Sequence, residues 1–422
     1  MTGLDQQIDL RPFPYPYRAA LAICSDIDNC DRKTFVAVHR YLNCPRKGLG
    51  LPVADSFFAW GREPEHMAYF LPDGKTPSAD APLIVRAIRG GLIDTLHAWG
   101  DFHIHAPEPA FLRHMAERLT RELVDQDLTL RVWVNHGDLS NRQNLRMRFA
   151  PAYFGDDLRS PYYTGDLYAA LGVKFYWWSE LVQWPLSCRR GLPAVKKTRM
   201  LLNNSLKSMA KLLLGQRRRI KTGRQLLELG VPVRMRDGQR LIGFTRFNRH
   251  PGGIWGQPTR HTLRHTLVPP VLDELVAREG YLILYTHLGQ PRHLSGDLFP
   301  GPDREALARL AAYYHDGRIW VAPTGQLLTY WLAHQKIAWQ VSRRDERIFI
   351  DVEKIDDPTT GPRTPAKEEL SGICFYSPEP NATVIRVDSE TVDTRVYPPD
   401  HTGMGMVGID PPTPPSLEPL EA

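Results

Sequence analysis

Along the first 335 residues, segments with two different patterns of hydrophobic and polar positions follow one another. Eight short apolar segments, rich in β-branched and aromatic residues, each end in polar residues or glycine. They predict strands at 18–25, 56–60, 92–96, 130–135, 173–178, 241–247, 281–286 and 318–322. Between them, apolar residues recur every three or four positions and predict helices at 81–90, 109–125, 267–279, 302–315 and 325–335. Runs such as AALAIC and YLILY suit parallel strands buried on both faces, so we predict an α/β fold with a (β/α) barrel of seven or eight parallel strands.

The pattern changes after residue 335. Short alternating segments (RIFIDVEKI, GICFYS and TVIRVDS), broken by Pro, Gly and Asn, predict a small antiparallel β domain at 336–397. Residues 398–422 are rich in Pro and Gly and poor in large apolar side chains, which predicts a disordered or surface-laid tail. The barrel is expected to span 1–335, with a basic insertion at about 185–235.

Composition places the 422-residue chain among ordinary globular proteins. Hydrophobic residues make up 42% and charged residues 24%, which excludes wholesale disorder, collagen-like and coiled-coil structure. The five cysteines are sparse, without the paired spacing of a zinc ribbon, and we expect free thiols. No apolar run approaches the ~20 residues needed to span a bilayer, and the N-terminal region has no apolar stretch of the signal-peptide type, so a cytoplasmic location is expected.

Positive charge is concentrated in the insertion. Between Cys188 and Glu228 the chain has twelve Lys and Arg residues and no carboxylate, whereas acids outnumber bases in the remainder. The net charge of +6 is therefore local, and no nucleic-acid partner is expected. The segment MLLNNSLKSMAKLLL is basic and amphipathic, which predicts peripheral contact with an anionic membrane through residues 189–224. The alternative is a lid helix packed on the barrel.

Ionisable residues follow four of the predicted strands. Catalytic groups of a parallel barrel lie where the strands end, on the face that carries the βα loops. The residues in that position are Asp26 and Asp28 after the first strand, His97 and Asp101 after the third, Asn135, His136 and Asp138 after the fourth, and His287 after the seventh.

Two of these pairs suit metal binding. Asp26 and Asp28, spaced by two, can share a cation or divide into a base and a ligand; a turn or helix cap is the alternative. His97 and Asp101, four residues apart, offer nitrogen and oxygen donors that match zinc or a similar divalent cation. The alternative here is a buried, hydrogen-bonded histidine and an exposed aspartate. His103 and His105 are close enough to compete.

This constellation resembles the polysaccharide deacetylase family, the NodB-like carbohydrate esterases. ALAICSDID resembles the family's first motif, LIDTLHAWGD a variant of its histidine motif, and LILYTHLG its Leu-x-His motif. The resemblance covers about residues 18–335 and implies a distorted (β/α) barrel. It implies Asp26 as catalytic base, His287 as acid, and Asp28, His97 and Asp101 as metal ligands, with zinc as the expected cofactor.

The chain departs from the family pattern at three places. Ile27 separates the two aspartates, Asp101 stands where a second histidine is usual, and the arginine-proline motif after the fourth strand is absent. Asn135 and His136 occupy that last position, and Arg246 can supply the missing positive charge. A literal histidine motif, His261 to His265, follows the sixth strand and would be a displaced metal site; an exposed helix start is the alternative.

The activity implied is metal-assisted hydrolysis of an N- or O-acetyl group on a polysaccharide or lipid-linked glycan precursor. Predicted substrate-binding residues are Trp99, Asn135, His136 and Arg246. Tryptophans near the rim can stack on sugars, although core packing is the alternative for each of them. Two other functions remain open: a non-catalytic glycan- or membrane-binding barrel, and a glycosyltransferase with a DxD metal site. The second lacks a preceding nucleotide-binding βαβ unit and a Gly-rich phosphate loop.

The basic segment generates the first testable prediction. The protein should sediment with acidic vesicles at low salt and less as ionic strength rises, because screening shortens the reach of surface charges to ~10 Å at 0.1 M. Neutral vesicles serve as the control and should recruit little protein. Replacing Arg217, Arg218, Arg219 and Lys221 by Gln should weaken the binding without unfolding the barrel. Binding that changes with neither salt nor these replacements would favour the lid helix.

Overall fold

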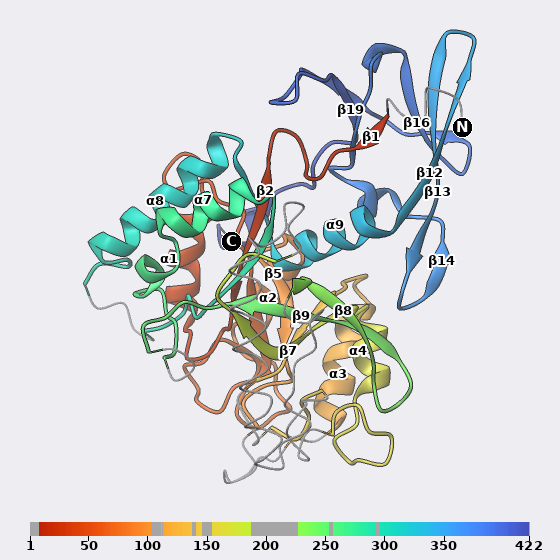
Figure 1. Ribbon diagram of the computed structural model, residues 1–422. Coiled ribbons are helices and arrows are strands. Elements are labelled where there is room, and N and C mark those ends of the chain that lie inside the picture. Colours follow the sequence, from red (N-terminus) through yellow and green to blue (C-terminus); the bar gives the residue numbers. More distant parts are fainter. Residues whose placement is uncertain are drawn as a thin grey trace, which may run out of the picture.

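Seven parallel strands close into a barrel in the computed structural model, which describes residues 8–102, 111, 113–136, 141–145, 154–186, 227–252, 256–291 and 296–421 (Figure 1). A single residue pair, Ser25 with Asp55, joins the first and last strands of the ring. The strands run in the order β2 (Ala19–Ser25), β10 (Tyr281–Thr286), β9 (Arg240–Phe247), β7 (Phe175–Val182), β6 (Val132–Val134), β5 (Ile93–His97) and β3 (Asp55–Trp60).

Three further strands flank this ring. The eighth predicted strand, β11 (Ile319–Val321), pairs in parallel with β2 outside the ring, and β4 (Ala68–Phe70) extends β3 in the same way. β8 (Gly230–Arg234) pairs antiparallel with β9. The predicted barrel and all eight predicted strands are confirmed.

The two faces of each barrel strand have different partners. On β2, Ala19, Leu21 and Ile23 pack against the surrounding helices, whereas Ala20 and Ala22 face the barrel interior. Such alternation follows from the two-residue period of a strand. The same inward rows on β6, β9 and β10 are apolar. Extended toward the carboxyl ends of the strands, these rows reach positions 26, 136, 246 and 287, where the side chains become ionisable.

Helices cover the barrel from two sides and from one end. α1 (Arg32–Asn43), α7 (Pro269–Ala277) and α8 (Gly301–His315) form one layer, and α2 (Ala81–Arg89), α3 (Arg113–Val124) and α4 (Gly165–Ala170) pack on another side (Figure 1). α9 (Thr324–Lys336) contacts both the barrel and the C-terminal sheets. The five predicted helices are confirmed as α2, α3, α7, α8 and α9. We did not predict α1. Its N-cap is Asp31, a residue type that favours helix starts, and Asp31 accepts a hydrogen bond of 2.6 Å from the Thr34 amide.

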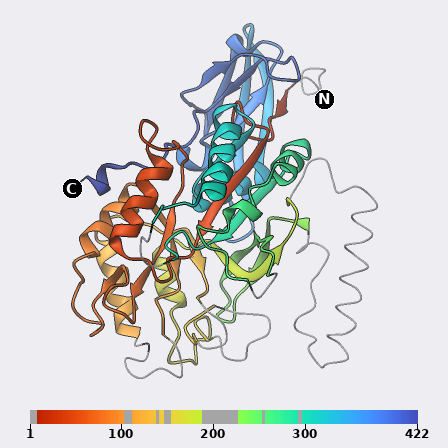
Figure 2. The ribbon, with the colours of Figure 1, turned by 90° about the vertical axis from the view of Figure 1, so that its left-hand side faces the viewer.

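The chain after residue 336, together with β1 from the N-terminal region, forms two small sheets above the barrel (Figure 2). One is antiparallel, in the order β1 (Asp9–Leu10), β15 (Cys374–Tyr376), β19 (Met406–Gly408) and β18 (Arg395–Tyr397). In the other, β12 (Ile337–Arg344), β13 (Arg347–Asp357), β16 (Thr383–Val387) and β17 (Glu390–Thr391) are adjacent in that order, and β14 (Gly361–Arg363) pairs with β13. The β13–β16 pair is parallel and the others are antiparallel. A small, mainly antiparallel β domain is therefore present.

The ends of the chain differ from the prediction. The segment 398–422 was predicted to be a disordered or surface-laid tail, but β19 lies between β15 and β18, with Met406 and Val407 at most 1% exposed. Near the C-terminus, the Ser416 amide donates to the Gly90 carbonyl at 2.8 Å and the short helix η6 (Glu418–Leu420) packs beside α2. Neighbours bury three of the apolar residues of this segment, Met406, Val407 and Leu420, which its average composition does not reveal. The β domain thus extends beyond 336–397 and includes β1.

Several residues of the predicted functional regions lie outside the described residues. They include most of the basic insertion (187–226), His103, His105, Asp138 and Trp255. Among the described residues, no helix is long and apolar enough to span a membrane.

The position of β19 gives a stability prediction. Met406→Ala should lower the free energy of unfolding by about 2–5 kcal/mol, because it removes a fully buried side chain from a packed sheet. Met404→Ala is the matched control: Met404 is 37% exposed two residues earlier, and its loss should change the free energy by no more than about 0.5 kcal/mol. Urea denaturation measures both. Equal midpoints for the two variants would contradict the placement of β19.

Candidate metal centre

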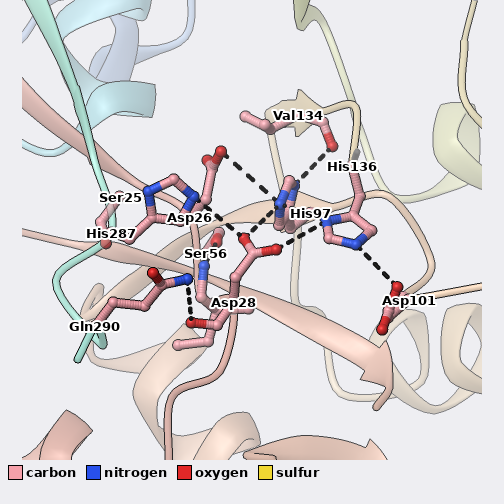
Figure 3. Close-up of polar contacts among 12 residues, drawn as sticks. Ser25, Asp26, Asp28, Ser56, His97, Asp101, Val134, His136, His287 and Gln290 are labelled. Carbon is pink, nitrogen blue, oxygen red and sulfur yellow. Dashed lines mark hydrogen bonds and ion pairs between the residues drawn. The ribbon is translucent and has the colours of Figure 1, made fainter. Parts of the chain in front are cut away.

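Two histidines and an aspartate meet at the carboxyl end of the barrel (Figure 3). His97 ends β5, His136 follows β6, and Asp28 follows β2. His97 Nε2 lies 3.0 Å from Asp28 Oδ2, and His136 Nδ1 lies 3.1 Å from both Asp28 Oδ1 and His97 Nε2. Three potential ligand atoms from three strands of the barrel therefore converge on one point.

The second ring nitrogen of each histidine has its own partner. His97 Nδ1 lies 3.1 Å from the Val134 carbonyl, and because a carbonyl only accepts, this nitrogen carries a proton. His136 Nε2 lies 3.2 Å from Asp101 Oδ1 and donates to it. When both rings are neutral, these partners leave the lone pairs of His97 Nε2 and His136 Nδ1 facing the cluster, where a cation can accept them. Phe58 supports both rings, stacked on His97 and edge-on to His136.

The donor set fits a divalent cation. Ligand atoms bound to one tetrahedral zinc ion at about 2.0–2.1 Å lie about 3.3 Å apart, close to the separations seen here. Two imidazoles and one carboxylate match zinc and related divalent ions in donor type. His97 is 1% exposed, so the protein shields the nitrogen donors from bulk water. These residues can therefore hold a metal ion and leave a coordination position for water or substrate.

Protons and a metal ion compete for this cluster. Burial raises the pKa of Asp28, but His136 and His97 lower it more, so its pKa lies well below the usual value. Burial lowers the pKa of His136, but Asp28 and Asp101 together have the larger effect and raise this pKa to about 10. His136 is thus protonated at pH 7 when no cation is bound. A metal ion must displace that proton, and metal affinity should rise with pH.

Asp26 forms a buried ion pair with Arg246 beside the cluster. Arg246 Nη1 donates to Asp26 Oδ1 at 2.6 Å and Nη2 to Oδ2 at 3.1 Å, and both residues are at most 3% exposed. The guanidinium carbon lies 3.6 Å from the ring centre of Trp177 and 3.9 Å from that of Tyr285. Asp26 Oδ2 also approaches His97 Nε2 at 3.8 Å, which places the ion pair next to the candidate metal ligands.

His287 lies on the opposite side of Asp28 from His136 (Figure 3). Its Nδ1 donates to the Pro258 carbonyl at 2.7 Å, and its Nε2 lies 3.7 Å from Asp28 Oδ2. The hydroxyl of Tyr285 lies 3.5 Å from the same Nε2. Asp26, Asp28 and His287 form a second group of potential ligand atoms, which shares Asp28 with the first.

Hydrogen bonds to neighbouring strands hold the loop that carries both aspartates. The Asp26 amide donates to the Thr286 carbonyl at 2.9 Å, and the Ile27 amide donates to Ser56 Oγ at 2.9 Å. These bonds connect the loop after β2 to β10 and β3. Ile27 is 2% exposed, so the residue that interrupts the paired aspartates is anchored in the core while its two neighbours face the site.

Asp101, predicted as a metal ligand, belongs to neither group of converging ligand atoms in the described residues. The chain turns sharply before it: Gly100 has a φ of +138°, and a Cβ at this position would lie 2.1 Å from the Trp60 carbonyl oxygen. The loop therefore runs along β3 instead of forming a helical turn over His97. Asp101 consequently meets the outer nitrogen of His136.

The predicted substrate contacts also need correction. Trp99 is 1% exposed and donates to Thr164 Oγ1 at 3.0 Å, so it belongs to the core. Asn135 is 1% exposed, accepts from Trp133 Nε1 and the Leu145 amide, and donates to the Leu145 carbonyl, which leaves it a structural role. Arg246 is fully buried against Asp26. His136 lies among the potential metal ligands, a position that its inward-facing row on β6 would have indicated.

The displaced histidine motif does not join the cluster. Leu263–His265 forms a 3-10 turn, η3, in which His265 is exposed. Within the described part of the chain, neither His261 nor His265 belongs to a group of converging ligand atoms.

The geometry predicts one metal ion per chain. Titration calorimetry with Zn²⁺ at pH 7 should give a stoichiometry of about one and release of about one proton, since His136 must deprotonate. His97→Ala and His136→Ala should each weaken binding by at least ~10-fold, because even the loss of an outer partner does so. His265→Ala serves as the control and should bind like the wild type. Wild-type affinity in either ligand variant would contradict the assignment.

Comparison with known proteins finds no family model, no curated protein and no solved structure that matches this chain.

Proposed function

We propose that this protein is a metal-dependent hydrolase that removes acetyl groups from a polysaccharide or a lipid-linked glycan precursor. One observation supports it above all: the cluster of Asp28, His97 and His136 lies between a buried Asp26–Arg246 pair and His287. Potential ligands, a carboxylate and an imidazole thus surround one point, as hydrolysis of an amide or ester requires.

Asp26 suits the role of general base. Arg246 fixes the orientation of its carboxylate with two hydrogen bonds, yet each oxygen keeps a further lone pair that can accept a proton from water. A divalent ion bound by Asp28, His97 and His136 would polarise the acyl carbonyl and lower the pKa of its bound water. Arg246 acts here as a positioning residue, in place of the arginine-proline motif that the chain lacks.

His287 suits the role of general acid. The Pro258 carbonyl holds its Nδ1 proton, which leaves Nε2 facing the cluster. When Nε2 is protonated, Asp28 and the imidazolium attract each other across 3.7 Å. From this position Nε2 can donate its proton to a departing amine or hydroxyl. Asp26 and His287 belong to different strands and approach the cluster from different sides, so the two proton transfers need not compete for one group.

The acetylated glycan is the narrower part of the proposal. It rests on the order of three motifs along the chain, which resemble those of the polysaccharide deacetylases. A non-catalytic barrel is the second candidate, and the two hydrogen bonds from Arg246 to Asp26 favour it, because the same pair would stabilise a barrel without any reaction. The two candidates differ in turnover and agree in metal binding.

Variants of the base and acid separate these candidates. Asp26→Asn and His287→Ala should each reduce acetate release from an acetylated oligosaccharide by 10²-fold or more, the usual contribution of a general acid or base. Zinc-loaded protein is used throughout. The exposed His265→Ala variant should keep wild-type activity. Wild-type protein that binds zinc but releases no acetate from N- or O-acetylated glycans would support the non-catalytic barrel.

A further inference from the structure

Asp101 contacts a candidate metal ligand without facing the metal position. Its Oδ1 accepts a hydrogen bond from His136 Nε2 at 3.2 Å, on the side of the ring away from Asp28 (Figure 3). Arg62 binds Asp101 twice: Nε lies 3.5 Å from Oδ2, and Nη2 donates to the backbone carbonyl at 3.3 Å. A chain of contacts thus runs from Arg62 through Asp101 and His136 to the cluster.

We propose that Asp101 is a positioning residue that orients His136 for metal binding, and that Arg62 holds Asp101 in place. This inference rests on the proposed metal centre. The two histidine rings are then oriented by different kinds of group. A backbone carbonyl orients His97, whereas a charged side chain orients His136. A carboxylate partner makes an imidazole a more basic ligand than a carbonyl partner does, so Asp101 should increase metal affinity through His136.

The backbone around Asp101 is held in a conformation that brings its side chain to His136. Ala98 and Gly100 both adopt positive φ angles, +47° and +138°, which reverse the chain directly after His97. The Ala98 amide donates to the Val134 carbonyl at 2.7 Å, and the Asp101 amide donates to the Trp60 carbonyl at 3.3 Å. The loop is therefore bonded to β6 on one side and to β3 on the other, with Asp101 directed to the His136 ring between them.

Two substitutions separate the charge of Asp101 from its hydrogen bond. Asp101→Asn keeps an oxygen that can accept from His136 Nε2 but removes the negative charge. Asp101→Ala removes both, and His136 Nε2 then loses this partner. The side chain of Asp101 is 29% exposed, so neither change leaves a large cavity. If the role is positioning, Asn should recover part of the affinity lost in Ala.

The experiment measures Zn²⁺ affinity by competition with a chelator, without any substrate. Asp101→Ala should bind Zn²⁺ 10- to 100-fold more weakly at an unchanged stoichiometry, on the order of the loss seen for outer-shell partners. Asp101→Asn and Arg62→Met should show smaller losses. Asp166→Ala is the matched control, since Asp166 is also paired with an arginine, Arg113, but is half exposed and lies on α4. It should bind Zn²⁺ as the wild type does.

A second readout distinguishes positioning from a structural role. The visible spectrum of the Co²⁺-loaded protein should change in Asp101→Ala and return toward that of the wild type in Asp101→Asn. Wild-type Zn²⁺ affinity in Asp101→Ala, or wild-type affinity in Arg62→Met, overturns the respective part of the inference. A wild-type protein that binds no Zn²⁺ refutes the metal centre itself, and protein that binds Zn²⁺ without releasing acetate refutes only the proposed activity.

Discussion

The ion pair between Arg246 and Asp26 determines how the carboxyl end of the barrel is organised. Both groups lie at the end of an apolar interior with almost no exposure to solvent, where an unpaired charge would cost several kcal/mol. Arg246 comes from β9, Asp26 follows β2, and the rings that flank the guanidinium belong to β7 and β10. Four strands must therefore meet in one register for the two charges to be compensated.

The same ion pair gives the two aspartates of the site different partners. Arg246 engages both oxygens of Asp26, so the neighbouring Asp28 is the carboxylate that remains for the two histidines. Because Ile27 is anchored in the core between them, the two aspartates keep separate partners. An adjacent pair would lack this spacer. Ile27 thus accounts for the way that one short loop serves both an ion pair and a ligand cluster.

Local patterns predicted the barrel well and the site only in part. Apolar runs such as YLILY identify strands because both strand faces are buried, and the strand ends then locate Asp26, Asp28, His97 and His287. The position of Asp101 depends on a backbone reversal next to Trp60, which chain spacing does not encode. Convergence of His136 with His97 depends on the pairing of β5 with β6, a long-range register. Short strands such as β1 and β19 carry too few apolar residues to be recognised without their neighbours.

One sheet joins β1, near the start of the described chain, to three strands from its last fifty residues. β1 begins at Asp9, yet its partner β15 begins at Cys374, and β19 completes the sheet after residue 405. Arg11 reinforces this closure through Asp400 at 3.2 Å. During synthesis, β1 cannot pair with β15 until the chain has been made as far as residue 376. Such non-local pairing slows folding and leaves the edges of the later strands exposed until the sheet is complete.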